Sequence, residues 1–358
     1  MPLSHTEVDA DITSQWHKKK TTFLIIVIYS LLVGCRYDVG VDYMGYLGWY
    51  NKVRLTGNFP VENSEIGYVW LNEILVSIEA HYVFLFIIIA FLQIFFLLKA
   101  MERYNFLLPW YFFFFFTSLL MFSSMNIMRQ TIAYFLFFYT ITLFLDKKYW
   151  QVALLVLLGA SFHKSILLFV WVYPLLRYDW FTNRYIQIGA LVVVTFIASQ
   201  WISIIIEYAS PIINLLGYQY YIENIDQMNE ITKDTSSGSG FGKYLLFFID
   251  VFIIFFSTRI KIQYHKVHIH SFYNLYFLGA ILERVFAENF ILSRTNDYLV
   301  NFRVLLLSFV CFHIFKNKVP FFQRVVAGLI VLSMLSYFYR GIDNSAAKCA
   351  PFSFFFDY

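Results

Sequence analysis

Polar and ionisable side chains in this sequence gather at the ends of long, Phe-rich apolar runs. They are Arg36, Asp38, Asp42, Tyr43, Glu65, Arg129, Gln130, His163, Arg294, Asp297 and Arg303. An ionisable group beside hydrocarbon is costly, and it usually marks the path of a substrate or an ion. Guanidinium groups bind phosphate oxygens through two parallel hydrogen bonds, and a histidine or carboxylate can take a hydroxyl proton near neutral pH. The set therefore predicts a site for a phosphate-bearing substrate and a proton transfer.

We divide these residues by the chemistry that each can do. His163 is the first candidate for a catalytic base, because it lies between two short apolar runs, where a break in the helix would turn its side chain toward a cavity. Asp42 and Glu65 are the reserve candidates for catalysis. The candidates for binding phosphates or sugars are Arg36, Tyr43, Arg129, Gln130, Arg294 and Arg303. Each residue alone also has a structural interpretation, such as a helix cap for Arg129 or an ion pair for Glu65.

No metal or cofactor is expected. The pattern closest to a metal site consists of His265, His268 and His270. These histidines lie in a basic loop, and side chains exposed to solvent explain them more simply than a metal site does. The cysteines are too few and too scattered for a zinc site or a disulfide framework: Cys35, Cys311 and Cys349. No phosphate-binding loop, dinucleotide fingerprint or nucleophile-elbow motif occurs. Glu283 and Arg284 lie within an apolar run, where pairing between helices explains them as well as a function does.

The composition is that of an integral membrane protein. Hydrophobic residues make up 59% of the 358 residues and charged residues only 14%. The mean hydropathy is +0.62, whereas a soluble domain has about 25% charged residues. The net charge of +4 is small and its lysines are scattered among short loops, which suits a lipid bilayer as a partner and gives no basic stripe for nucleic acid.

Eleven apolar runs are candidates for membrane spans, so we predict an all-α polytopic fold with about 11 (10–12) transmembrane helices. The runs are 21–35, 81–98, 107–124, 128–145, 149–162, 165–177, 185–206, 243–258, 271–291, 297–315 and 320–339. Two of them, 149–162 and 165–177, are short and meet at His163 and Lys164, which indicates tilted helices or a break near that point.

The remaining segments complete a single integral membrane domain over residues 1–358 with an outward-facing cavity. The apolar stretch near 65–79 is too short to cross a bilayer and is predicted to be a re-entrant or interfacial helix. Basic residues alternate between loops in a way that places the N-terminus in the cytoplasm. Two long outward loops follow from this orientation, 36–64 and 207–242, and the second, with its Ser/Gly-rich tip, is a candidate lid.

Four short motifs in the N-terminal half resemble those of the EpsG/Wzy-type polysaccharide polymerases. Residues 36–46 resemble the signature "R…G-x-D-Y-x-x-Y", residues 65–72 "E-x-G-Y…L-N", residues 129–133 "R-Q-x-x-A" and residues 162–165 "F-H-x-S". Toward the C-terminus, Arg294 and the segment 297–303 resemble the "R…Y" region of the family. The hydropathy profile is similar over the whole chain.

The resemblance implies polymerisation of O-antigen or exopolysaccharide at the outer face of the bacterial inner membrane. A growing glycan would move from one undecaprenyl diphosphate to the terminal sugar of another lipid-linked repeat unit. The partners would then be undecaprenyl-diphosphate-linked oligosaccharides, the bilayer and, as a candidate, a chain-length regulator. The enzyme would be a metal-independent glycosyltransferase, since its leaving group is a lipid diphosphate.

Two other functions stay open on the sequence. A flippase or transporter of lipid-linked oligosaccharides would bind the same anion without making a bond, and it would be expected to carry charge through its core. A membrane O-acyltransferase could use His163 as a base, but no second paired histidine motif lies near it.

Overall fold

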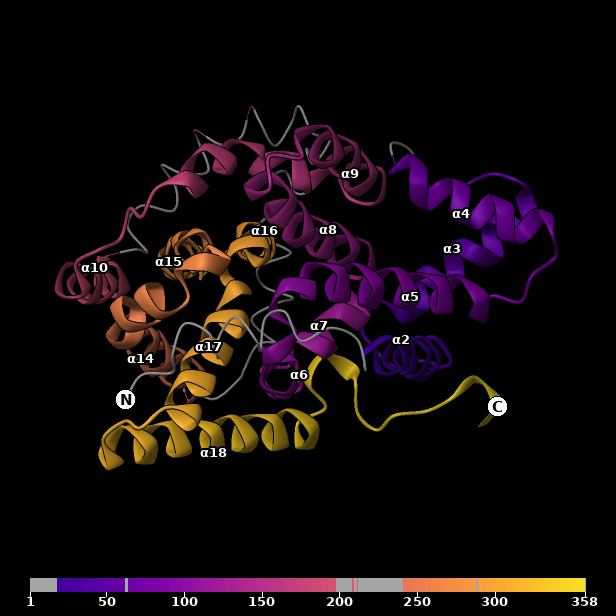
Figure 1. The fold of residues 1–358 in the computed structure, drawn as a ribbon. Coiled ribbons are helices and arrows are strands. Elements are labelled where there is room, and N and C mark those ends of the chain that lie inside the picture. The colour runs from indigo at the N-terminus through magenta and orange to yellow at the C-terminus, as the bar shows by residue number, and fades with distance from the viewer. Residues whose placement is uncertain are drawn as a thin grey trace. The chain divides into compact units, whose positions relative to one another are not determined.

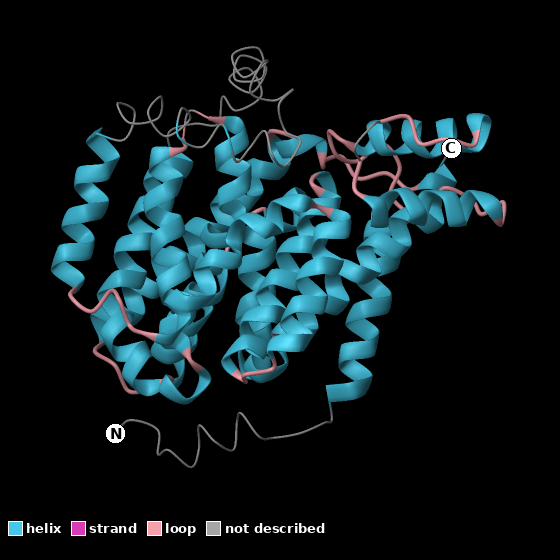
Figure 2. Ribbon diagram, turned by 90° about the horizontal axis from the view of Figure 1, so that it is seen from above, coloured by secondary structure: helices cyan, strands magenta, loops and turns pink. Residues whose placement is uncertain are grey.

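The chain is helical throughout the parts that the structure, a computed structural model, describes: residues 18–61, 64–197, 208, 211, 241–287 and 289–357. Within them no strand forms, and the only extended pairing is an isolated antiparallel bridge between Arg36 and Phe354 (Figure 2). Helices satisfy the backbone polar groups internally, as apolar segments in hydrocarbon require. The predicted all-α fold class is confirmed.

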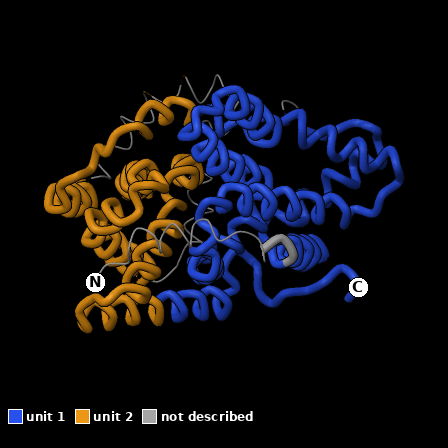
Figure 3. Tube along the Cα trace, viewed as in Figure 1, with its two compact units in different colours: residues 1–168, 334–358 blue, residues 169–333 orange. Residues whose placement is uncertain are grey.

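Two compact units make up the chain, Met1–Leu168 with Met334–Tyr358 and Phe169–Ser333 (Figure 3). The first contains α2 (Lys18–Gly34), α3 (Tyr43–Thr56), α4 (Ile66–Ser77), α5 (Val83–Ala100), η1 (Glu102–Leu107), α6 (Leu108–Thr117), α7 (Leu120–Asn126), α8 (Met128–Leu145), α9 (Tyr149–Phe162), η5 (Ala346–Lys348) and η6 (Phe355–Asp357). The second contains α10 (Arg184–Ile197), α14 (Phe241–Gln263), η4 (His265–Val267), α15 (Ile269–Val285), α16 (Phe290–Val300) and α17 (Phe302–Lys316). The helices η2 (Lys164–Arg177) and α18 (Phe321–Asp343) cross the unit boundaries. That the whole is one integral membrane domain stays a prediction.

The core of the first unit is built around α8. Helix α2 packs on α5, α5 on α8 and α8 on α9 (Figure 1). Inside the protein, 78% of the α8 span is buried, compared with 61% of α5. Arg129, near the start of α8, is therefore held by the more enclosed of these two long helices.

A helix also occupies the segment 36–64, which was predicted as an outward loop. Helix α3 buries one face, with Tyr43, Tyr46, Tyr50 and Val53 at helical spacing. It ends at Gly57, whose left-handed backbone (φ 73°) closes the last turn. The short helix predicted near 65–79 is present as α4, and its placement at the membrane surface stays a prediction.

Two of the predicted spans are broken. The run 107–124 forms α6 and α7, bent by 66° at a break where Leu119 has a left-handed backbone (φ 63°). The run 165–177 is the 3-10 helix η2, which contains Pro174. Because α9 ends at Phe162 and His163 is extended, the expected break near His163 is confirmed.

The second unit packs α15 on α16 and α14 on α17, and α10 on both α14 and α15. The predicted runs 271–291 and 297–315 have to be corrected, because α15 ends at Val285 and α16 already begins at Phe290, with α17 following from Phe302. Asn289 caps the start of α16, since its side-chain Oδ1 accepts the backbone N–H of Leu292 at 2.9 Å.

Four helices are long and apolar enough to cross a membrane, or five if the bent α6–α7 pair is one span, within the described residues. They are Val83–Ala100, Met128–Leu145, Leu292–Lys316 and Phe321–Asp343. The lengths and compositions of the described helices therefore do not confirm the predicted count of about eleven crossings. The run 185–206 is described only to 197, and the candidate lid 207–242 lies outside the described residues apart from isolated positions.

The C-terminal segment folds back onto the turn that follows α2. The backbone N–H of Tyr37 donates to Ser353 and that of Phe355 to Cys35, both at 2.9 Å. Lys348 Nζ also pairs with Asp38 at 2.7 Å. The last residues of the chain thus stabilise the turn that leads into α3.

Candidate functional site

Glu65 and Arg129 form the central contact of the candidate site in the first unit. Arg129 Nη1 donates to Glu65 Oε2 at 2.6 Å, although the two residues lie 64 positions apart. Their side chains are only 17% and 8% exposed, respectively. Removing one partner of such an enclosed pair leaves an unpaired charge, which costs about 3–5 kcal/mol. The structure thus brings together two residues that the sequence predicted separately.

Aromatic rings fix the plane of the Arg129 guanidinium. Its Cζ lies 5.4 Å from the ring centroid of Trp49 and 5.1 Å from that of Tyr68. The rings of Tyr46 and Phe59 extend this cluster, with their centroids 5.9 and 5.8 Å, respectively, from the ring centroid of Tyr68. Cation–π contacts of this kind favour a charged arginine. The Nε of Arg129 is buried and has no hydrogen-bond partner among the described residues, so this N–H is an unsatisfied donor.

His163 lies beside this pair, at the break after α9. The backbone N–H of Lys164 donates to Glu65 Oε1 at 3.4 Å, so the Glu65 carboxylate joins Arg129 to the segment that carries His163. His163 Nδ1 lies 2.7 Å from Ser165 Oγ. The backbone N–H of Ser165 also donates to Nδ1, at 3.4 Å, when Nδ1 is unprotonated. In the other tautomer Nδ1 carries the proton and donates to Ser165 Oγ, and Nε2 then keeps a lone pair and can accept a proton.

A glycine allows these elements to approach. A Cβ on Gly67, in the first turn of α4, would lie 2.5 Å from Ser161 Oγ and 2.9 Å from the Ser161 carbonyl oxygen. Real Cβ atoms do not come this close to other heavy atoms, so the contact of α4 with α9 requires a residue without a side chain at position 67. This contact places Glu65, the residue before α4, within reach of Lys164.

Arg36 lies apart from this cluster, fully buried at the turn after α2. Its guanidinium donates to the backbone carbonyls of Val33, Val39 and Met125. Its Cζ also lies 5.5 Å from the ring centroid of Tyr43, and that ring stacks on Phe86 at 4.4 Å. Burial lowers the pKa of Arg36 to about 10, so it remains charged at neutral pH. This geometry favours a role for Arg36 and Tyr43 in holding the turn together.

Asp42 and Gln130 complete the predicted residues of the first unit. The backbone N–H of Asp42 donates to Asn126 Oδ1 at 3.3 Å, and the Asp42 side chain is partly exposed at the start of α3. Gly40, two residues earlier, needs its φ of +105° and leaves room for Asn126. Gln130 is buried in α8, next to Arg129.

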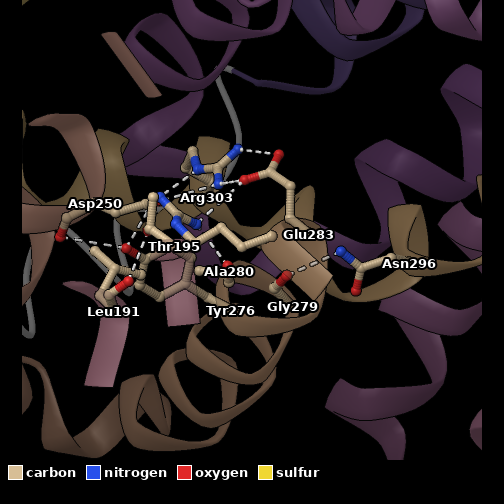
Figure 4. A network of polar contacts seen from close by, with 10 residues as sticks. Leu191, Thr195, Asp250, Tyr276, Gly279, Ala280, Glu283, Asn296 and Arg303 are labelled. Atoms are coloured by element: carbon tan, nitrogen blue, oxygen red, sulfur yellow. Dashed lines mark hydrogen bonds and ion pairs between the residues drawn. The ribbon is translucent and has the colours of Figure 1, made fainter. Parts of the chain in front are cut away.

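A second polar cluster lies within the helices of the second unit (Figure 4). Arg303 of α17 donates to both carboxylate oxygens of Asp250, which is fully buried in α14, through Nε at 2.7 Å and Nη2 at 3.0 Å. Its Nη1 donates to Glu283 Oε1 at 3.0 Å and its Nη2 to Glu283 Oε2. Arg284 and Tyr276 also donate to Asp250, at 2.8 and 2.9 Å. Arg303, a predicted site residue, thus belongs to a network of four charged residues with Asp250, Glu283 and Arg284.

Arg294 lies near this network, on α16. Asp297, also on α16, interacts electrostatically with both Arg294 and Glu283. The predicted residues therefore fall into two groups, one in each unit, and Arg294 and Arg303 belong to the second.

The family model described as the EpsG family matches residues 19–354. This chain belongs to the EpsG family. No curated protein and no solved structure matches it. Together with the apolar helices, the family indicates a membrane protein and suggests a function like that of a polysaccharide polymerase.

In this EpsG-family protein, three residues of the two polar clusters were not among the predicted site residues. Ser165 is part of the F-H-x-S motif, and its contact with His163 explains the serine. Trp49, which lies over the Arg129 guanidinium, belongs to none of the sequence motifs. Asp250 could have been found, because a lone carboxylate within an apolar run needs a partner.

A groove of about 590 Å³ runs between α14 and α18 in the second unit. Its walls are mostly apolar and include Phe248, Phe252 and Phe322. The predicted site residues do not line it, so the predicted outward cavity stays a prediction. Among the described residues, no three or more His, Cys, Asp or Glu side chains are grouped to hold a metal ion.

Proposed function

We propose that this EpsG-family protein is a membrane glycosyltransferase that polymerises lipid-linked repeat units of a surface polysaccharide. The observation that carries the proposal is the cluster of Glu65, Arg129 and His163. It combines a fixed cation, a carboxylate and a titratable imidazole within a chain of this family. The substrates are undecaprenyl-diphosphate-linked oligosaccharides, and the product is O-antigen or exopolysaccharide.

In the proposed reaction, a hydroxyl oxygen of the acceptor sugar attacks the anomeric carbon of the donor glycan. The bond from that carbon to the diphosphate oxygen breaks, and undecaprenyl diphosphate leaves with its electron pair. His163 Nε2 takes the hydroxyl proton while Nδ1 donates to Ser165. General-base catalysis of this kind typically contributes about 10²- to 10⁴-fold to the rate.

The other residues have supporting roles in this proposal. Arg129 donates from Nε to an oxygen of the substrate while Glu65 and the aromatic rings hold its orientation. Asp42 and Glu65 are the reserve bases. Arg294 and Arg303, which belong to the second unit, are the proposed phosphate ligands there, and Arg36 and Tyr43 support the turn that precedes α3.

We place the reaction at the outer face of the bacterial inner membrane, in a multi-pass protein whose site faces the periplasm or the cell exterior. A chain-length regulator is a candidate partner. The orientation follows from the distribution of basic loops, and the family supports a role in polysaccharide synthesis.

A flippase for lipid-linked oligosaccharides is the second candidate. Asp250 and Arg303 favour it, because Asp250 places a charge in the middle of apolar α14 and pairs there with Arg303 of α17, as a substrate path through the membrane would require.

A strain that lacks the protein separates the two functions. Loss of a polymerase should leave the surface lipid capped with single repeat units, seen as one band in place of a glycan ladder. Loss of a flippase should instead trap lipid-linked units inside the cell, and that result would contradict the proposal.

A further inference from the structure

Arg303 uses two edges of its guanidinium group for two different carboxylates. The edge formed by Nε and Nη2 binds Asp250, and the edge formed by Nη1 and Nη2 binds Glu283. Each contact is bidentate, which is also the geometry in which a guanidinium binds two oxygens of a phosphate. Glu283 therefore occupies the position that a phosphate group would take.

The two carboxylates are held differently. The Asp250 side chain is 0% exposed and also accepts hydrogen bonds from Arg284 and Tyr276, whereas the Glu283 side chain is 31% exposed. Glu283 moreover lies in the last turn of α15, where the helix dipole disfavours a negative charge. Glu283 can regain contact with water if it leaves Arg303, but Asp250 would stay buried and unpaired.

The charges favour such an exchange. Arg284 and Arg303 balance Asp250 and Glu283, so the network is neutral while Glu283 is in place. Without Glu283, two guanidinium groups face a single carboxylate, and the network carries one net positive charge. An anion that replaces Glu283 offsets this positive charge in a setting of low polarity, where charge pairs interact strongly.

We propose that Arg303, oriented by Asp250, is a binding site for a phosphate oxyanion, and that Glu283 is the intrinsic carboxylate which this ligand displaces. The identification of the ligand as the diphosphate of a lipid-linked glycan rests on the proposed function, whereas the anion site itself does not. Glu283 would keep the arginine paired between catalytic cycles and would compete with the substrate.

Binding of inorganic pyrophosphate to the purified full-length protein in neutral detergent tests this proposal by calorimetry at constant ionic strength. Glu283→Gln should bind pyrophosphate about tenfold more tightly than the wild type, because the competing charge is gone. Glu283→Asp, which shortens the reach to Arg303, should also bind more tightly, and Arg303→Lys should bind much more weakly. Glu102→Gln, in an exposed pair with Lys99, removes the same charge elsewhere and should leave the affinity unchanged.

Unchanged or weaker binding in both folded Glu283 variants would overturn the proposal and reduce the network to a structural one. If neither variant folds, hydrogen exchange on the wild type decides. Saturating pyrophosphate should speed amide exchange in the last turn of α15, where Glu283 is released, while the middle of α14 stays protected. Binding without this change would contradict the displacement.

Two sources could supply the phosphate, and competition distinguishes them. Displacement of pyrophosphate by phosphatidylglycerol in nanodiscs would support the site and assign it to a lipid headgroup. Resistance to phosphatidylglycerol would support it as a diphosphate site. Because these assays measure binding alone, they can succeed even if the protein makes no polysaccharide.

Discussion

His163 is the extended residue between α9 and η2, and Ser165 contacts its ring. The contact of its Nδ1 with Ser165 Oγ at 2.7 Å selects the orientation of the ring. A base must present its lone pair to the substrate, so in the proposed reaction the hydroxyl of Ser165 would position the ring and His163 would take the proton.

We expect His163→Ala to lower the elongation rate about 10²- to 10⁴-fold, the usual loss on removing a general base. Cells with this variant should accumulate single-repeat glycan although the protein is still made and inserted. Ser165→Ala should lower the turnover rate with little change in KM, and Ser165→Thr should restore it. His265→Ala, at an exposed histidine, is the control. A normal ladder from His163→Ala would move the base to a carboxylate.

Replacing Arg129 tests whether elongation needs a planar cation that is held in one orientation. Arg129→Lys keeps the charge but loses the available Nε donor and the fit between Trp49 and Tyr68, so elongation should fall about ten- to a hundredfold. Arg103→Lys changes the same residue type in a more exposed pair with Asp146, and it should have little effect. Equal rates for the two variants, measured on glycan ladders at matched protein levels, would remove Arg129 from the site.

At the scale of elements, the contact of α4 with α9 determines where Glu65 lies. Gly67→Ala would force a Cβ into the Ser161 side chain and backbone, which costs about 1–3 kcal/mol and moves Glu65 away from Lys164. We expect a lower midpoint of thermal unfolding in detergent and reduced polymerisation.

The matched control is Gly189→Ala in α10, where an added Cβ meets nothing within 4 Å. Alanine in the interior of a helix should be neutral or stabilising by about 0.5–1 kcal/mol. A similar response of the two glycine variants would show that the approach of α4 to α9 is not what fixes the site.

The sequence predicted some elements to the residue and missed others for clear reasons. The runs 128–145 and 149–162 coincide with α8 and α9, because charged residues such as Asp146 and Lys147 separate the two apolar runs. Helix α3 was missed because its weak apolar stripe of tyrosines lies in a segment interpreted as a loop. The break between α6 and α7 depends on the backbone of Leu119, which no residue preference indicates.

Pairings over long separations could not be predicted from one sequence. Glu65 and Arg129 were each candidates, but nothing in a linear pattern joins residues 64 positions apart. The same holds for Asp250 and Arg303, which lie 53 positions apart. Their residue types indicated polar sites, and only the packing of the helices showed which charges neutralise each other.

At the scale of the whole molecule, the chain places one polar cluster in each of its two units, within an EpsG-family membrane protein. The first carries the proposed base and the second the proposed anion site. A protein that forms glycosidic bonds needs both functions, whereas a flippase needs only the binding of its anionic substrate.

Elongation in proteoliposomes that contain only the purified protein and lipid-linked repeat units tests the central claim most directly. The account predicts glycans of increasing length, with one undecaprenyl diphosphate released for each unit added, and no elongation with His163→Ala. Repeat units that cross the bilayer without becoming longer would contradict it.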